Sequence, residues 1–125
     1  MNFPENLRYT KEHEWIRVEG TTGIIGITDY AQGELGDVIY LDVTTGNAVG
    51  AGDSFGSVEA VKTVSDLYAP VSGTVSELNP KLSDSPDLVN RDPYGEGWLV
   101  KIALTNPADV DALLSAADYK KLIGQ

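Results

Sequence analysis

Short runs of β-branched and aromatic residues, separated by glycine and proline, constrain the fold of this chain more than any other feature. The 125 residues include 13 glycines and 6 prolines, and extended segments punctuated by turn residues are typical of a small β-sandwich or barrel. The sequence therefore predicts a mainly β fold, a flattened barrel or sandwich of two antiparallel sheets. The predicted strands are 14–18, 23–27, 38–43, 54–61, 63–68, 73–78 and 98–103.

A short helix is predicted near 28–34, directly after the second of these strands. Thr28 has the side-chain oxygen that helix N-caps prefer. Gly33 or Gly36 would end the helical turn, because glycine adopts the left-handed conformation found at helix C-termini.

Helical signals also fill the C-terminal part of the chain. Asn106 before a proline is typical of a helix start. Ser115, with Asp118 three residues later, is similar to a capping box in which Asp replaces the usual Glu or Gln. We expect one domain over 1–125, with a helical extension over about 107–123 that covers the open side of the sheet in a structural role.

Composition excludes several classes of function. The chain has 9 basic and 19 acidic residues, no cysteine, and a net charge of −10. Nucleic acids and anionic membrane surfaces call for basic patches, so neither is an expected partner. The absence of cysteine excludes disulfides and thiolate metal sites. No apolar run approaches a membrane span and no signal peptide is visible, which predicts a bacterial cytoplasmic location, or the mitochondrial matrix in a eukaryote.

One lysine lies where the sequence predicts the tip of a hairpin. Lys62 separates the predicted strands 54–61 and 63–68, and its neighbours are small or β-branched, which leaves the amine unobstructed. A lysine held out on a rigid hairpin suits the attachment of a prosthetic group that swings away from the protein. Glu59 and Asp66, one on each arm, are candidates for recognition by the enzyme that attaches the group.

Several ordered motifs indicate a known family. The chain resembles the H protein of the glycine cleavage system from about Leu7 to Ile123, nearly its whole length. The resemblance rests on YTKEHEW at 9–15, GITDYAQ at 26–32, LGD at 35–37, GSVEAVK at 56–62, SDLYAPVSG at 65–73, LVN at 88–90, DPYG at 92–95 and GWL at 97–99.

The resemblance implies a function and its cofactor. Lys62 would carry lipoate in amide linkage, on a fold of the lipoyl- and biotinyl-carrier type. The protein would be a non-catalytic shuttle for the aminomethyl group of glycine. The sulfur chemistry would belong to the cofactor.

The partners implied by the resemblance are enzymes. A pyridoxal-phosphate glycine decarboxylase would load the aminomethyl group, and an aminomethyltransferase would pass it to tetrahydrofolate. Dihydrolipoyl dehydrogenase would reoxidise the dithiol. A lipoate ligase or lipoyl/octanoyl transferase would attach lipoate, and the chain is expected to be a monomer.

One glutamate is a candidate for contact with the arm or its cargo, and the sequence leaves the role of a second one open. Glu14 matches the position that the family links to holding the aminomethyl amine, and a carboxylate paired with an ammonium is a charge-assisted contact. An ordinary exposed strand residue is the alternative interpretation of Glu14. Glu34 falls on the predicted short helix, at a position that varies in the family.

Other carrier proteins and an unmodified interaction protein share some of these sequence features. A relay that donates lipoate to other carriers would have the same motifs, and an unmodified β-sandwich interaction protein would have the same fold. Biotin carriers typically flank their lysine with methionines, whereas Val61 and Thr63 flank Lys62 here. Lipoyl domains of 2-oxoacid dehydrogenases usually have aspartate before the lysine and a flexible linker, and this chain has neither.

The chain has no motif of an intrinsic enzyme or metal site. His13 is the only histidine, and no Gly-x-Ser-x-Gly elbow is present. The acidic residues Asp84, Asp87 and Asp92 do not match the spacing of a calcium loop.

Overall fold

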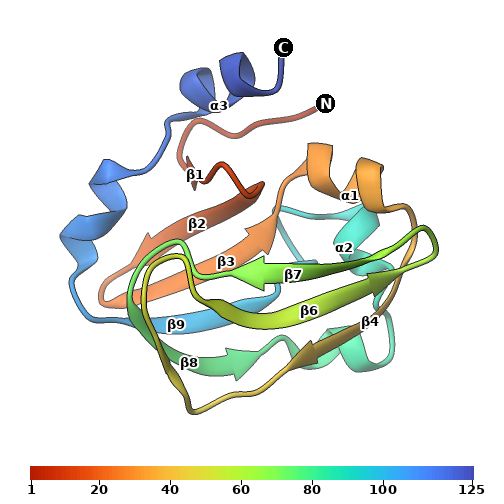
Figure 1. The fold of residues 1–125 in the computed structure, drawn as a ribbon, viewed down its shortest axis with the longest axis horizontal. Helices are drawn as coiled ribbons and strands as arrows, with labels where there is room; N and C mark the ends of the chain where they lie inside the picture. The colour runs from red at the N-terminus through yellow and green to blue at the C-terminus, as the bar shows by residue number, and fades with distance from the viewer.

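The computed structural model describes residues 1–125 and consists of nine strands and five short helices (Figure 1). The strands are β1 (Arg8–Tyr9), β2 (Glu14–Glu19), β3 (Thr22–Ile27), β4 (Val38–Val43), β5 (Ala48–Val49), β6 (Ser54–Ala60), β7 (Val64–Tyr68), β8 (Gly73–Leu78) and β9 (Val100–Leu104). The α-helices are α1 (Asp29–Leu35), α2 (Leu88–Arg91) and α3 (Ala116–Leu122), and the 3₁₀ helices are η1 (Pro80–Ser83) and η2 (Pro107–Ala112).

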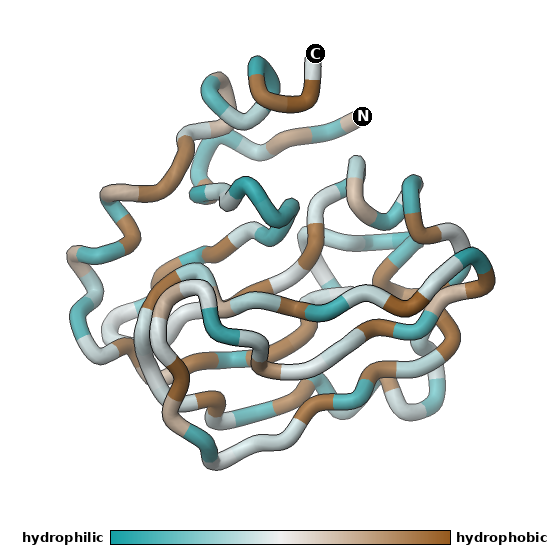
Figure 2. Tube along the Cα trace, viewed as in Figure 1, coloured by the Kyte–Doolittle hydropathy of each residue, from teal (hydrophilic) through white to brown (hydrophobic).

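The strands form two antiparallel sheets. One has six strands in the order β1-β2-β3-β9-β8-β5, and the other has three in the order β4-β6-β7. Hydrophobic and hydrophilic residues alternate along several of the strands (Figure 2), because successive side chains in a strand point to opposite faces. The predicted sandwich of two antiparallel sheets is confirmed.

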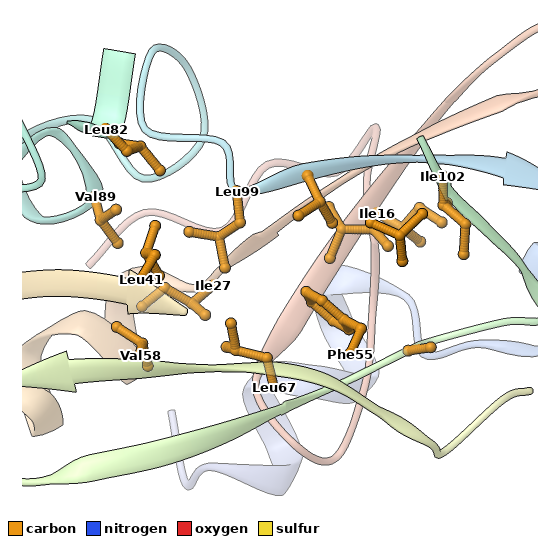
Figure 3. Packing of buried hydrophobic residues seen from close by; sticks show 14 of the residues in the cluster. Ile16, Ile27, Leu41, Phe55, Val58, Leu67, Leu82, Val89, Leu99 and Ile102 are labelled. Atoms are coloured by element: carbon orange, nitrogen blue, oxygen red, sulfur yellow. The ribbon is translucent and has the colours of Figure 1, made fainter. Parts of the chain in front are cut away.

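A core of 19 buried hydrophobic residues lies between the sheets. Figure 3 shows Leu67 and Phe55 of the smaller sheet pointing toward Leu99 and Ile16. Burial of this apolar surface is the dominant stabilising contribution to the fold.

A second, smaller core lies on the outer face of the six-stranded sheet. Its seven buried residues are Phe3, Leu7, Tyr9, Trp15, Ile24, Ala116 and Tyr119. Neighbouring residues in one strand divide between the two cores: Trp15 and Ile24 belong to the outer core, whereas Ile16 and Ile25 belong to the inner one. The chain termini meet at this outer core (Figure 1), where Phe3 packs edge-on against Tyr119 with ring centroids 5.6 Å apart.

The indole of Trp15 requires a glycine on the next strand. Gly26 pairs with Trp15 across β2 and β3, and a Cβ on Gly26 would lie 2.6 Å from the indole. The indole N–H donates to the carbonyls of Ile27 (3.1 Å) and Pro93 (3.0 Å). This contact connects β2 and β3 to the turn that follows α2.

The predicted boundaries needed few corrections. The first hairpin strand, β6, ends at Ala60 instead of residue 61, and the second, β7, begins at Val64 instead of residue 63. The last strand, β9, begins at Val100 instead of residue 98. α1 begins after Thr28, whose hydroxyl accepts the Ala31 N–H, and ends at Leu35 with Gly36 as its C-cap.

The C-terminal prediction needed a larger correction. Residues Pro107–Ala112 form a 3₁₀ helix, Leu113 is extended, and only Ala116–Leu122 is α-helical. The predicted Ser115 cap is present, since its hydroxyl accepts the Asp118 N–H. The short elements β1, β5, η1 and α2 were not predicted, because two to four residues carry no periodic pattern of their own.

Candidate functional site

Lys62 lies at the tip of the hairpin between β6 and β7, at the right of Figure 1. The Ala60 N–H donates to the Thr63 carbonyl (2.9 Å), which closes the turn. Val61 and Lys62 both have negative φ, so the turn is not of the I′ or II′ type that matches strand twist. A contact from outside the hairpin supports it instead, because the Val61 N–H donates to the carbonyl of Asp37 (3.0 Å).

The loop that supports the tip is itself held by one side chain. Asn90 on α2 accepts the Val38 N–H (2.8 Å) and donates to the carbonyl of Gly36 (2.8 Å) and the side chain of Gln32 (3.1 Å). Because a side-chain amide has both donors and an acceptor, one residue fixes the loop on both sides of Asp37. The hairpin tip is therefore connected to α1 and α2 through the Asp37 carbonyl and the Asn90 side chain.

The Lys62 side chain is exposed and passes beside Gly36 at the end of α1. A Cβ built on Gly36 would lie 3.3 Å from both Cγ and Cε of Lys62. The amine has no ion-pair partner. Val61 and Val64 beside it are 62% and 61% exposed, so the free amine stands in an apolar surface that an enzyme can contact.

A cavity of about 270 Å³ lies between α1 and the strands β2, β3, β6 and β7; we call it the Glu14 cavity. Its apolar walls come from Ile27, Leu35, Val58 and Leu67. Four carboxylate side chains also line it, those of Glu12, Glu14, Glu34 and Asp66. This combination of apolar wall and negative charge suits a ligand with an apolar chain and a cationic group.

Glu14 is the buried member of this carboxylate set, with 2% of its surface exposed. Its interpretation as an ordinary exposed strand residue is therefore wrong. One carboxylate oxygen accepts the Thr10 hydroxyl (3.0 Å) and the other accepts the Tyr68 N–H (3.1 Å). Burial raises the pKa of Glu14 to about 7, although both hydrogen bonds oppose this change. A cation entering the cavity would supply the charge partner that the ionised carboxylate lacks.

Asp66 and Glu59 lie in different surroundings, although both were predicted to guide modification of Lys62. Asp66 is exposed on the edge strand β7 and lines the Glu14 cavity. Glu59 is exposed on β6, pairs across the hairpin with Val64, and does not line this cavity. Glu34 lies on α1 and lines it.

His13 connects the cavity to the C-terminal helix. It lies in the turn between β1 and β2 with φ +69° and lines the Glu14 cavity. Its Nδ1 lies 2.8 Å from the hydroxyl of Tyr119 on α3, and that hydroxyl also lies 2.8 Å from Thr28 Oγ1. The C-terminal segment was predicted to be purely structural, but Tyr119 reaches a residue of the candidate site.

Sequence reasoning missed Thr10, Asn90, Tyr119 and the backbone N–H of Tyr68 as parts of this site. Asn90 and Thr10 fall inside family-like motifs, which was a usable signal for them. The contacts of Tyr119 and Tyr68 span 106 and 54 residues of sequence, so no local pattern indicates them.

Two other features bear on the class of protein. No group of His, Asp and Glu side chains is arranged to hold a metal ion. No helix in the structure has the length and apolar character needed to cross a membrane.

Comparison with known proteins gives a consistent result. The family model described as glycine cleavage H-protein matches residues 7–125. The glycine cleavage system H protein of Bacteroides fragilis is 56% identical over 124 residues, covering 98% of each chain. That of Chlorobaculum tepidum is 56% identical over 128 residues, covering 100% of each.

The comparison with solved structures agrees. The crystal structure of a glycine cleavage system H protein from Mycobacterium marinum matches with a TM-score of 0.88 and 40% identity, covering 98% of this chain and 99% of that one. The fold is thus that of the lipoyl-type carrier domains, a β-barrel–sandwich with the candidate lysine on a hairpin. Within this class, the chain belongs to the glycine cleavage H-protein family. It is a carrier component of the glycine cleavage system and not one of its catalysts.

Proposed function

We propose that this chain carries lipoate on Lys62 and shuttles the aminomethyl group of glycine. The group passes from the glycine decarboxylase to the tetrahydrofolate-dependent aminomethyltransferase, and dihydrolipoyl dehydrogenase then reoxidises the carrier. The observation that carries the proposal is the position of one exposed, unpaired lysine beside α1, the helix that also lines the Glu14 cavity.

The residues present fit a lipoyl group. The Lys62 amine has no partner to displace before an amide bond forms. Leu35, Val58 and Leu67 give the cavity an apolar wall, which suits the hydrocarbon chain of the arm. Lipoate would supply a disulfide that accepts the one-carbon unit, which the chain lacks because it has no cysteine.

The protein's own residues would hold and shield the cargo. An aminomethyl amine is a cation at neutral pH, and the ionised Glu14 is the buried carboxylate available to accept its hydrogen bonds. Asp66 and Glu34 add negative charge at the same cavity. Because a charge-assisted contact strengthens where water is excluded, docking in the cavity would lower the loss of the cargo to water.

Peptide mass spectrometry after co-expression with a lipoate ligase and added lipoate tests the attachment. We expect one lipoyl increment, mapped to Lys62. No increment, under conditions that modify a control lipoyl domain, would refute the proposal.

A reconstituted assay with the three partner enzymes tests the role. We expect the lipoylated chain to support glycine cleavage and the Lys62→Arg variant to support none. A chain that transfers lipoate to apo dehydrogenase domains but does not support glycine cleavage would be a lipoyl relay instead.

A further inference from the structure

A buried chain of hydrogen bonds runs from α1 to the ring of His13. The Ala31 N–H donates to Thr28 Oγ1 (3.1 Å), which lies 2.8 Å from the Tyr119 hydroxyl. The Tyr119 hydroxyl lies 2.8 Å from His13 Nδ1. Thr28 and Tyr119 both have 0% of their surface exposed, so bulk solvent does not reach their hydroxyls.

The donors and acceptors in this chain have one consistent direction. The Thr28 hydroxyl hydrogen has one available acceptor, the Tyr119 oxygen, because the other partner of Thr28 is itself a donor. A buried hydroxyl left without an acceptor is costly. Thr28 therefore donates to Tyr119, and Tyr119 donates to His13 Nδ1. A neutral imidazole whose Nδ1 accepts carries its proton on Nε2.

The Nε2–H of His13 is free to meet a ligand. His13 makes a single side-chain hydrogen bond, the one through Nδ1. Every buried side-chain nitrogen and oxygen in the structure has a hydrogen-bond partner, so Nε2, which has none, is accessible. His13 also lines the Glu14 cavity, so a ligand that enters this cavity would lie beside the His13 ring.

The backbone gives independent evidence that this side chain is needed. His13 ends a turn in which its N–H donates to the Thr10 carbonyl (3.1 Å) and the Thr10 N–H donates to the Glu14 carbonyl (2.9 Å). A φ of +69° is unfavourable for a residue with a Cβ, and glycine is the usual occupant of this last position of a three-residue hairpin loop. Backbone strain that persists beside a cavity is typical of a functional constraint.

We propose that Tyr119 is a positioning residue of the Glu14 cavity, whose hydroxyl holds His13 neutral with its proton on Nε2. The part of this inference that concerns cargo rests on the proposed function. A protonated His13 would repel a cationic amine, and the opposite tautomer would present a basic lone pair to it. Tyr119 disfavours both forms, because protonating Nδ1 would leave the Tyr119 hydroxyl without its acceptor. Glu14 then remains the acceptor for the amine.

The electrostatic surroundings of His13 are compatible with a neutral ring. Burial lowers the pKa of His13, while Glu12 and Glu34 oppose that change. The other titratable groups that line its cavity or contact its ring are Glu14, Tyr30, Asp66 and Tyr119.

NMR of the unmodified chain, with isotope-labelled histidine, tests the tautomer directly. His13 is the single histidine, so one imidazole gives the whole signal. We expect, at neutral pH, the ¹⁵N shift of Nδ1 at the unprotonated position and that of Nε2 at the protonated position. A spectrum with the proton on Nδ1 would overturn the proposal, and this result needs no variant to fold.

Two phenylalanine variants separate the effect of the Tyr119 hydroxyl on His13 from the effect of aromatic packing. In Tyr119→Phe, we expect the two ¹⁵N shifts to move toward each other as the second tautomer gains population. Tyr9→Phe is the matched control, because Tyr9 stacks on Tyr119 (ring centroids 5.0 Å apart) and donates to the Pro4 carbonyl without contacting His13. Unchanged shifts in Tyr119→Phe, or equal changes in both variants, would count against the proposal.

The role toward the cargo has its own measurement. With lipoylated, aminomethyl-loaded protein, we expect Tyr119→Phe to lose the cargo several-fold faster than Tyr9→Phe. Equal rates would refute the role toward cargo. Because the tautomer is measured on the unmodified chain, failure of lipoylation at Lys62 would refute the proposed function without changing the tautomer result.

Discussion

Gly36 and Lys62 lie against each other although 26 positions separate them in the chain. Gly36 caps α1 with φ 80° and ψ −163°, a conformation that is essentially restricted to glycine. A Cβ there would lie 3.3 Å from Cγ and Cε of Lys62 and 3.0 Å from a methyl group of Val61. The end of α1 therefore sets the direction in which the lysine stem leaves the hairpin.

Gly36→Ala tests this relationship. We expect it to cost about 1–3 kcal/mol of stability, because alanine is strained in this conformation. It should also slow lipoate attachment, since the new methyl group presses on the Lys62 stem. The measurements are denaturant unfolding and the initial rate of modification by a lipoate ligase.

Gly33→Ala is the matched control for Gly36. Gly33 lies inside α1 and has open space around it. Alanine there should stabilise the protein by up to about 1 kcal/mol and leave the modification rate unchanged. Equal modification rates in the two variants would show that Gly36 does not position the lysine.

Lys62→Arg should remove lipoylation while leaving the fold intact. The side chain is exposed and has no ion-pair partner, and surface substitutions of this kind usually change stability by less than about 0.5 kcal/mol. Denaturant unfolding and intact mass spectrometry check the two halves of the prediction. A large loss of stability would mean that the lysine stem contributes to packing on Gly36.

Glu14 should make stability depend on pH. Its pKa rises on folding from 4.5 to about 7, so between these values the folded protein binds more protons than the unfolded chain. The contribution of Glu14 to the free energy of unfolding is fully present below pH 4.5 and decreases as pH rises. Above pH 7 the total decrease is about 3 kcal/mol.

Glu14→Gln removes this titration. Unfolding free energies of the native chain and Glu14→Gln, measured from pH 4.5 to 8, should differ in slope, with the variant losing less stability as pH rises. Parallel profiles would show that Glu14 ionises in the folded protein as it does in the unfolded one.

Substitutions of Glu59 and Asp66 should distinguish two steps of the carrier's cycle, lipoate attachment and protection of the loaded cargo. Glu59 lies outside the Glu14 cavity, whereas Asp66 lines it. We expect Glu59→Gln to slow lipoate attachment a few-fold, because exposed charge interactions are worth about 0.2–1 kcal/mol. Asp66→Asn should also shorten the lifetime of the loaded cargo. The rate of lipoate attachment and the lifetime of the loaded cargo are both measured on the same preparation of each variant. Equal cargo lifetimes in the two variants would assign Asp66 to attachment alone.

Local sequence predicted most of the fold, for an identifiable reason. Strands such as β3 and β8 and the caps Thr28 and Ser115 are specified by residues next to one another, so alternation and capping chemistry indicate them. β1 has two residues and exists because it pairs with β2. The segment 107–112 has a helix-start signal, but it forms a 3₁₀ helix that ends at an extended Leu113.

The candidate site also has one part that local sequence specifies and another that depends on tertiary packing. The hairpin with Lys62 at its tip could be predicted because both strands and the turn are contiguous. The burial of Glu14 could not, since it depends on α1 and on the Tyr68 N–H of another sheet.

The sequence by itself determined the β-sandwich class, the family and the exposed lysine, because these follow from contiguous patterns and ordered motifs. Only the tertiary structure decided which side chains share the Glu14 cavity, that Gly36 lies against Lys62, and that Tyr119 reaches His13. These relationships join residues far apart in the chain. They arise from the packing of two sheets and a C-terminal helix, where distance in space is independent of distance in sequence.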